Sequence, residues 1–392
     1  MKQKTIFITG ATGFLGSHLV YEMLKMGHRI IALSRKSKSN YASPMLRVIE
    51  TLKAIDENVN ISRNNLIVIE GDVTNSGDEL FKEIINNQID YIDEVWHCVA
   101  TFKIKEKDIE EIKRINIEGC RNMLNLVVMI NQKMKSSCRY FHVSTAYSSG
   151  RKAKPIEEKI QKENPNFRSL YEWSKNQSEL LIETYQKDYN LDITILRPSI
   201  IIGAKKNKVL SRAGYYQFCE ELYTLKKRFE VNMGSSFDGN IDVRFICNAN
   251  ICLNLVPMDY ITNSMLALAN KKELVTNELK IFNIINENAP NIGEVQQLLC
   301  KDLRISGFNM IEEEEFNKNP PSPLEKLFDR KLVFQAPYMR EDVRFSNENF
   351  RKHLTFDEIP TPIMDENFLH TINEDFFKAL QEVFNLRLKT TT

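Results

Sequence analysis

The connection between the first apolar run and the residues after it constrains the fold of this chain more than any other feature. The run TIFIT (residues 5–9) has the length and composition of a buried strand, and FLGSHLVYEMLKMG (residues 14–27) has the pattern of a helix that ends at a glycine. Between them, TGATGFLG supplies Gly10, Gly13 and Gly16. Glycine permits a tight turn and close approach of a pyrophosphate, and a helix N-terminus presents free N–H groups to phosphates. We therefore predict a dinucleotide site here, against the alternative of an ordinary strand–helix turn.

The alternation of a short apolar run with a longer helical pattern continues through the first half of the chain. The apolar runs lack strict polar alternation, which indicates strands buried on both faces of a parallel sheet. Repeated units of this kind are typical of an α/β fold, namely a Rossmann-type doubly wound parallel sheet. We predict a nucleotide-binding Rossmann domain over residues 1–203, to which residues 241–285 return. Residues 204–240 and 286–392 are expected to form a smaller, mostly helical C-terminal substrate-binding lobe.

Composition and charge limit the classes of partner. The chain has 53 Lys and Arg against 52 Asp and Glu, so it lacks the basic excess typical of nucleic-acid-binding proteins. The seven cysteines are scattered without a C-x-x-C pair, which favours reduced thiols in a cytoplasmic protein. The six histidines show no ligand spacing, so we expect no metal. We also expect neither a signal peptide nor a membrane span, because the N-terminus runs directly into a strand and no apolar run is long enough.

The end of the second expected strand indicates which nucleotide binds. An NAD site usually places an acidic residue there, on the ribose hydroxyls, but this chain reads ALSRKSKS. Ser34, Arg35 and Lys36 are placed to meet a 2′-phosphate, to which the arginine fork is well matched. We therefore predict NADPH; the alternative is that Arg35 only stacks on the adenine. The GDV turn after the third strand places Asp72 and Val73 at the adenine edge, unless it is a plain strand-end turn.

The spacing Tyr-x-x-x-Lys, which puts a tyrosine one helical turn before a lysine, occurs three times. The pairs are Tyr21–Lys25, Tyr171–Lys175 and Tyr223–Lys227. The first lies among apolar residues of the first helix, and the third lies in an irregular basic stretch, so both are interpreted as structural. The second begins the helix that follows YFHVSTAYSSG, a strand that ends at Ser144 and Thr145. Parallel strands end at one edge of the sheet, where ligands bind, so this pair can meet the nicotinamide.

The chemistry of such a pair is simple. A free tyrosine has a pKa near 10, and a lysine cation one turn away lowers it. Lys175 can also bond the ribose, and Thr145 can bond the substrate oxygen. Tyr171 then gives a proton or a strong hydrogen bond to the oxygen that gains charge as hydride arrives. We predict Thr145, Tyr171 and Lys175 as the catalytic residues.

These motifs, in order, resemble the extended short-chain dehydrogenase/reductase family. The blocks TGATGFLG, HVSTAY, Tyr171 with Lys175, LRPSIIIG and VPMDY carry the resemblance, over residues 4 to 285. FHVSTAYSSG followed by RKAKPIEE is similar to the male-sterility branch, which contains fatty acyl-CoA reductases and thioester reductase domains. The resemblance implies Thr145 rather than Ser144, because Thr145 lies five residues before Gly150. It implies these cofactor-binding residues: Gly10, Thr12, Gly13, Phe14, Leu15, Gly16, Arg35, Lys36, Asp72, Val73, Ala100, Lys175 and Pro198.

Two further residues depart from the family pattern or have an open role. Val99 stands where relatives often carry alanine, near the cofactor. Asn116, in INIEG, matches a helix asparagine often seen in these reductases, and a role on the helix surface is an equal alternative.

The resemblance implies an NADPH-dependent reductase of an acyl thioester, held by coenzyme A or by an acyl or peptidyl carrier protein. The basic stretch with Lys205, Lys206, Lys208 and Arg212 could meet the phosphates of coenzyme A or the acidic face of a carrier protein, or it is a solvated helix.

A nucleotide-sugar epimerase or dehydratase is a second candidate, which LSRK disfavours because those enzymes usually hold NAD. A ketone or alcohol dehydrogenase fits the same trio. A non-catalytic NADPH sensor is disfavoured because such proteins often lose the Tyr/Lys pair.

Overall fold

The computed structural model describes residues 2–36, 43–62, 64–103, 106–134, 137–152, 154–163, 166–203, 214–333 and 335–390. The chain divides into two compact units. The first comprises Met1–Ser199, Met258–Ile285 and Phe345–Pro360. The second comprises Ile200–Pro257, Asn286–Arg344 and Thr361–Thr392.

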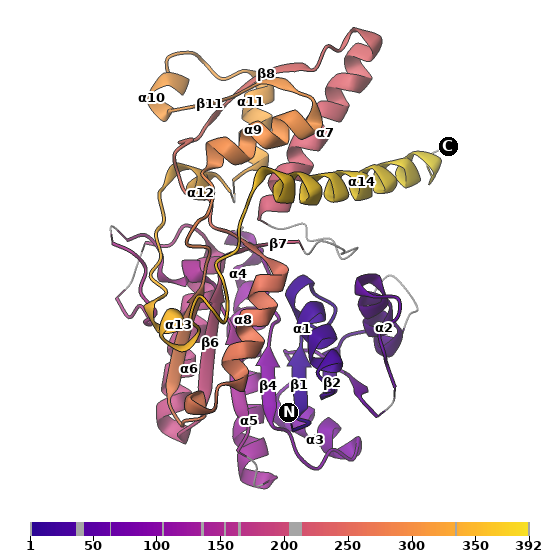
Figure 1. Ribbon diagram of the computed structural model, residues 1–392, viewed down its shortest axis with the longest axis vertical. Coiled ribbons are helices and arrows are strands. Elements are labelled where there is room, and N and C mark those ends of the chain that lie inside the picture. The colour runs from indigo at the N-terminus through magenta and orange to yellow at the C-terminus, as the bar shows by residue number, and fades with distance from the viewer. Residues whose placement is uncertain are drawn as a thin grey trace. The chain divides into compact units, whose positions relative to one another are not determined.

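The first unit is built on a seven-stranded sheet in the order β10-β6-β5-β4-β1-β2-β3 (Figure 1). Every pairing in it is parallel. The strands are β1 Thr5–Thr9, β2 Arg29–Ser34, β3 Leu66–Glu70, β4 Glu94–His97, β5 Arg139–Val143, β6 Ile193–Pro198 and β10 Leu279–Ile284. The strand order reverses between β1 and β4, which is the switch point where doubly wound sheets bind ligands. The predicted fold class is therefore confirmed.

Helices connect these strands. They are α1 Phe14–Lys25, α2 Pro44–Ile55, α3 Gly77–Asn86, α4 Ile109–Ile112, α5 Gly119–Lys133, α6 Leu170–Tyr189, α8 Met258–Asn270 and α13 Glu348–His353. Short 3-10 turns occur at η1 Glu106–Asp108, η3 Ala146–Ser149 and η5 Lys272–Leu274, and η2 Lys113–Glu118 is a π-helix. The core consists of apolar strand and helix residues such as Phe7, Val95 and Leu124, none of which is exposed. Burial of such strands on both faces accounts for the unbroken apolar runs in the sequence.

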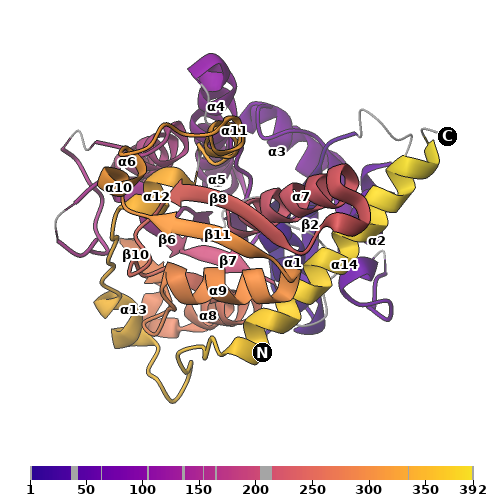
Figure 2. The same cartoon turned by 90° about the horizontal axis from the view of Figure 1, so that it is seen from above.

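The second unit combines helices with two small sheets. Its helices are α7 Tyr215–Met233, α9 Ile292–Leu303, α10 Glu313–Phe316, α11 Pro323–Lys331, α12 Ala336–Arg340 and α14 Glu366–Thr390, with the 3-10 turn η4 Gly234–Ser236. Its strands are β7 Ile200–Ile202, β8 Asn240–Ile246, β9 Leu255–Pro257 and β11 Ser306–Ile311. β7 pairs with β9, and β8 pairs with β11, both in parallel. Figure 2 shows β8 and β11 side by side.

The units differ from the predicted domain boundaries in two ways. Residues 200–203 and 241–257 were expected in the Rossmann domain, but they belong to the second unit because β7 pairs with β9 and β8 with β11 there. Residues 345–360 were expected in the lobe, but they belong to the first unit. Asn283 explains this second difference, because its side chain donates to the carbonyls of Ile156 and Ser346, at 3.1 and 2.8 Å.

Within the described residues, none of the helices combines the length and apolar content that crossing a membrane requires.

Candidate active site

The glycine turn after β1 forms a narrow backbone cradle. Gly10 has φ +79°, and its carbonyl oxygen accepts a hydrogen bond from the Gly13 nitrogen at 2.8 Å. A Cβ at Gly16 would lie 2.2 Å from that oxygen, so only glycine lets the start of α1 pack this closely. No side chain caps the N-terminus of α1, and its first turn has no acidic residue. The free N–H groups and the helix dipole therefore suit a bound pyrophosphate.

The other residues predicted around this turn are accessible to different degrees. Gly13 is exposed, and Thr12, Phe14 and Leu15 are half-buried at the start of α1. These residues are thus accessible at the surface rather than sealed inside the core.

The ends of β2 and β3 present charged side chains to solvent. Arg35 and Lys36 are exposed, and each is paired with a carboxylate from the neighbouring strand end. Arg35 Nη1 lies 3.5 Å from Asp72 Oδ2, and Lys36 Nζ lies 2.9 Å from Glu70 Oε1. Exposed ion pairs contribute about 0–1 kcal/mol, so a phosphate could compete for both cations.

The loop after β3 is fixed by local bonds. Asp72 Oδ1 accepts from the Thr74 nitrogen at 2.9 Å, and Val73 is buried with its carbonyl bonded to Asn122 at 3.0 Å. Ser34 is buried, with a relative exposure of 6%, and its hydroxyl has no partner among the described residues. Of the three residues predicted to meet a 2′-phosphate, Arg35 and Lys36 are thus the accessible ones.

A buried asparagine connects the loop after β4 to α6. Asn116 lies in the π-helix η2 and is 2% exposed, so the alternative of a surface role is wrong. Its side-chain oxygen accepts from the Thr101 nitrogen at 2.8 Å, and its amide donates to Ser174 Oγ at 2.8 Å. Ser174 in turn donates to the carbonyl of Tyr171 at 2.8 Å. Val99 and Ala100, just before Thr101, are half-buried. The arrangement fixes the loop at the switch point against the helix that carries Tyr171.

The turn after β5 distinguishes Thr145 from Ser144. The Ser144 hydroxyl donates to the buried Glu179 carboxylate at 2.5 Å. Thr145 instead caps η3, accepting from the Tyr147 nitrogen at 3.3 Å, and it is 8% exposed. Gly150 closes the turn with φ +66° and ψ −157°, a conformation that is essentially restricted to glycine. Of the two hydroxyls, Ser144 is committed to the interior and Thr145 is not.

Lys175 is buried one turn after Tyr171 on α6. Its Nζ donates to the carbonyl of Val143, the last residue of β5, at 2.7 Å. Burial lowers the pKa of Lys175 to about 8. Burial also raises the pKa of Tyr171, to which the Glu172 charge adds. The Tyr171 ring stacks on Phe102, with ring centroids 4.7 Å apart. The bond to Val143 ties the lysine to the strand that leads into Thr145.

Two buried histidines lie behind Lys175, at paired positions of β4 and β5. His97 and His142 are unexposed, with ring centroids 5.4 Å apart. Burial lowers the pKa of His97 to about 3 and that of His142 well below its usual value, and the Lys175 charge adds to both shifts. Both imidazoles are therefore neutral near pH 7. The sequence analysis did not single out this pair. The signal that could have found it is a histidine near the end of each of two neighbouring strands, in EVWH and in YFHV.

The two other Tyr-x-x-x-Lys pairs have structural contacts. The Tyr21 phenol donates to Asp56 at 2.8 Å, and burial raises its pKa to about 12. Lys25 lies over the Tyr21 ring at 5.1 Å. Tyr223, in the second unit, is buried and stacks on Phe377 with centroids 5.8 Å apart. Neither tyrosine belongs to the switch-point edge of the sheet.

The remaining predictions concern a basic stretch, metal ligands and Pro198. Lys205, Lys206, Lys208 and Arg212 lie outside the described residues. Among the residues that the structure does describe, no group of three or more His, Cys, Asp and Glu side chains could hold a metal ion. Pro198 is buried at the end of β6, opposite Ile284 of β10.

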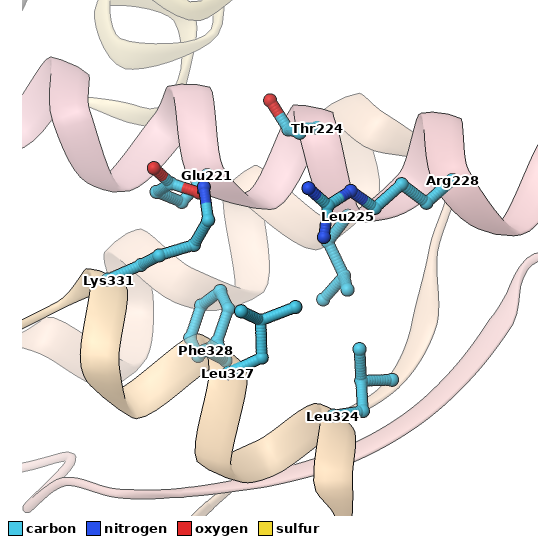
Figure 3. Close-up of a pocket in the computed structure, with 8 residues that line it drawn as sticks. All are labelled: Glu221, Thr224, Leu225, Arg228, Leu324, Leu327, Phe328 and Lys331. Carbon is cyan, nitrogen blue, oxygen red and sulfur yellow. The ribbon is translucent and has the colours of Figure 1, made fainter.

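A shallow depression lies between α7 and α11 in the second unit (Figure 3). Leu225, Leu324 and Leu327 line it. At its rim Lys331 pairs with Glu221 at 2.6 Å. Its cavity volume of about 10 Å³ is far below the roughly 300–1,000 Å³ of ordinary ligand pockets.

A glycine cradle at the switch point of a doubly wound sheet, with a buried lysine, a tyrosine and a threonine in the same unit, is typical of a dinucleotide-binding domain. The chain belongs to the male sterility protein family of NAD-binding proteins, part of the extended short-chain dehydrogenases/reductases, whose model matches residues 8–265.

Individual relatives are similar in sequence to this chain over parts of their length. Fatty acyl-CoA reductase 1 of Xenopus laevis is 28% identical over 235 residues, which cover 50% of this chain and 43% of that protein. UDP-glucuronate 4-epimerase 4 of Arabidopsis thaliana is 23% identical over 77% of this chain and 64% of its own length. The chain thus spans less than half of the fatty acyl-CoA reductase it matches.

A solved thiolation–reductase di-domain from an archaeal non-ribosomal peptide synthetase shares the fold. Its TM-score is 0.70 at 20% identity, over 97% of this chain and 92% of that chain.

Proposed function

We propose that this chain is an NADPH-dependent reductase of an acyl thioester, carried by coenzyme A or by a carrier protein, that yields an aldehyde or an alcohol. The observation that carries the proposal is Lys175, buried and bonded to the last carbonyl of β5, one turn after Tyr171. This is the arrangement needed to hold a phenol ready for proton transfer beside the turn that carries Thr145. Membership in a family that includes fatty acyl-CoA reductases supports a thioester as the substrate.

The residues divide the chemistry among them. When bound, NADPH supplies the hydride that reduces the thioester carbonyl. Tyr171 and Thr145 donate hydrogen bonds to the carbonyl oxygen as it gains negative charge. We expect the Lys175 cation to favour transfer of the Tyr171 proton by charge proximity. It acts against burial and the Glu172 charge, which raise the pKa of Tyr171, the opposite of the lowering predicted from the sequence. The resulting hemithioacetal collapses to an aldehyde and a free thiol, and a second reduction of the aldehyde gives the alcohol.

The cofactor is assigned to residues of the first unit. Gly10, Gly13 and Gly16 with Thr12, Phe14 and Leu15 would hold the pyrophosphate, and Arg35 and Lys36 the 2′-phosphate. Asp72, Val73, Ala100 and Pro198 would line the adenine and nicotinamide ends. Removal of both cations in Arg35→Ala/Lys36→Ala should lower the preference for NADPH over NADH by about 100-fold or more, since charge-assisted bonds contribute about 1.5–3 kcal/mol each. An unchanged ratio of kcat/KM values for the two cofactors would contradict this assignment.

The second candidate is a nucleotide-sugar epimerase, supported by the Arabidopsis thaliana relative. The exposed cations after β2 speak against it, because they favour a 2′-phosphate over NAD. The test is to follow NADPH absorbance with acyl-CoAs of several chain lengths, aldehydes and ketones, and to assay UDP-glucuronate for epimerisation without net cofactor consumption. Oxidation of NADPH with an acyl-CoA supports the thioester reductase. Turnover of UDP-glucuronate instead would overturn it.

A further inference from the structure

A buried ion pair joins α6 to β6 close to the proposed catalytic residues. Glu179 and Arg197 are both unexposed. Arg197 Nε donates to Glu179 Oε1 at 2.9 Å, and Nη2 donates to Oε2 at 2.5 Å. The remaining arginine donors reach the carbonyls of Glu157 and Lys159, at 3.2 and 3.1 Å. A bidentate pair with its remaining donors satisfied holds one geometry, and loss of either partner leaves an uncompensated buried charge.

The turn that carries Thr145 is attached to this pair. Ser144 Oγ donates to Glu179 Oε1 at 2.5 Å, and Ser148 Oγ donates to the same oxygen at 3.0 Å. The two serines bracket Thr145, so Glu179 sets where the threonine lies relative to α6. Glu179 follows Lys175 by one helical turn and Tyr171 by two, which places all three on the same face of α6.

Glu179 also acts on Lys175, one helical turn before it on α6. The other titratable groups that interact with Lys175 are His97 of β4, Cys98 just after it, His142 of β5 and Cys120 of α5. Near pH 7 the two histidines are neutral, and burial raises the pKa of each thiol to about 12. Among these groups Glu179 is therefore the carboxylate that favours the lysine cation, and its own counter-charge is Arg197.

We propose that the Glu179–Arg197 pair is a positioning device for the active site, which fixes the Thr145 turn on α6 and holds a carboxylate one helical turn after Lys175. This inference rests on the function proposed above for Thr145, Tyr171 and Lys175. Neither member of the pair touches the reacting atoms.

Three variants separate the two roles. Glu179→Gln removes the negative charge and leaves Arg197 unpaired, so the pKa of Lys175 falls. Arg197→Met leaves the carboxylate unbalanced, so the pKa of Lys175 rises. Ser144→Ala/Ser148→Ala keeps both charges but releases the turn. The matched control is Asp192→Asn, which disrupts another buried ion-pair group, with Arg139 and Lys280, at the opposite ends of the strands.

The expected readouts have opposite signs. In the pH profile of kcat, the alkaline limb should move by about one unit toward acid in Glu179→Gln and about one unit toward alkali in Arg197→Met. The serine double variant should lower kcat by about 10- to 100-fold at an unchanged KM for NADPH, without moving the limb. The control Asp192→Asn should lose stability, but its alkaline limb should not move and its kcat should not fall. The inference would be overturned by an alkaline limb of the kcat profile that does not move in either charge variant. It would also be overturned by a limb that moves in the same direction in both.

A second measurement keeps the test independent of turnover. The 13Cε shift of Lys175, assigned with Lys175→Arg in protein labelled at lysine, reports its titration directly. If the Lys175 titration shifts in opposite directions in the two charge variants while the wild type does not reduce a thioester, the charge role of the pair is retained. The proposed substrate is then rejected. Titrations that do not differ from the wild type in folded variants would reject the inference whatever the activity.

Discussion

At the scale of single residues, the structure distinguishes two adjacent hydroxyls that the sequence leaves side by side. Ser144 is bonded to Glu179 in the interior, whereas Thr145 caps the 3-10 turn η3 at the edge of the sheet. Thr145→Ala should therefore lower kcat/KM by about 100- to 1,000-fold, the usual cost of a lost oxyanion donor. Ser144→Ala should cost less than about tenfold, because Ser148 still anchors the turn. Steady-state kinetics of both variants test this, and a larger loss in Ser144→Ala would reverse the assignment.

At the scale of elements, the two ends of α1 allow a matched comparison. A Cβ at Gly16 would lie 2.2 Å from the Gly10 carbonyl oxygen, whereas at Gly27, which has φ +81°, nothing lies within 4 Å. Gly16→Ala should distort the cradle and weaken NADPH binding at least about tenfold, while Gly27→Ala should only cost about 1 kcal/mol of stability through its backbone conformation. Fluorescence titration with NADPH and chemical denaturation separate the two effects. Wild-type affinity in folded Gly16→Ala would contradict the cradle.

The elements also show what sequence reasoning could and could not predict. The helix predicted to begin with Tyr171 and Lys175 is α6 Leu170–Tyr189, because its local pattern and its Ser169 cap suffice to define it. The π-helix Lys113–Glu118 was not predicted, since Asn116 is held by tertiary bonds to Thr101 and Ser174. The strands β8 and β11 were also missed, because their pairing joins residues more than sixty positions apart. Glu179 and Arg197 carried no signal in the sequence because only the fold brings them together.

At the scale of the whole molecule, a late segment completes the first unit. Glu158, which is buried, accepts from the backbone nitrogens of Asn283 at 2.8 Å, Asn349 at 2.5 Å and Phe350 at 3.1 Å. Glu158→Ala leaves three buried donors unpaired, so it should lower the free energy of unfolding by about 3 kcal/mol. Glu158→Gln keeps an acceptor and should cost less. Denaturation and hydrogen exchange at Asn349 and Phe350 measure this, and unchanged exchange in Glu158→Ala would refute it.

The same carboxyl makes stability depend on pH. Burial raises the pKa of Glu158 to about 7, although the three N–H donors oppose the shift. Between about 4.5 and 7 the folded state then binds more protons than the unfolded state, so the free energy of unfolding should decrease as pH rises through this window. Glu158→Gln should lack this contribution. Denaturation curves of both proteins at about pH 5 and 7 test it, and parallel pH dependence would show that another group is responsible.

The most direct test of the account compares the three tyrosines. Purified Tyr171→Phe, Tyr21→Phe and Tyr223→Phe are assayed for NADPH oxidation with the best acyl-CoA, beside the wild type. The account predicts a loss of about 100-fold or more in kcat for Tyr171→Phe alone, as expected for a lost general acid. It predicts near wild-type kcat in the other two, because their rings serve packing in α1 and α7. Undiminished activity in folded Tyr171→Phe would contradict the assignment of the active site.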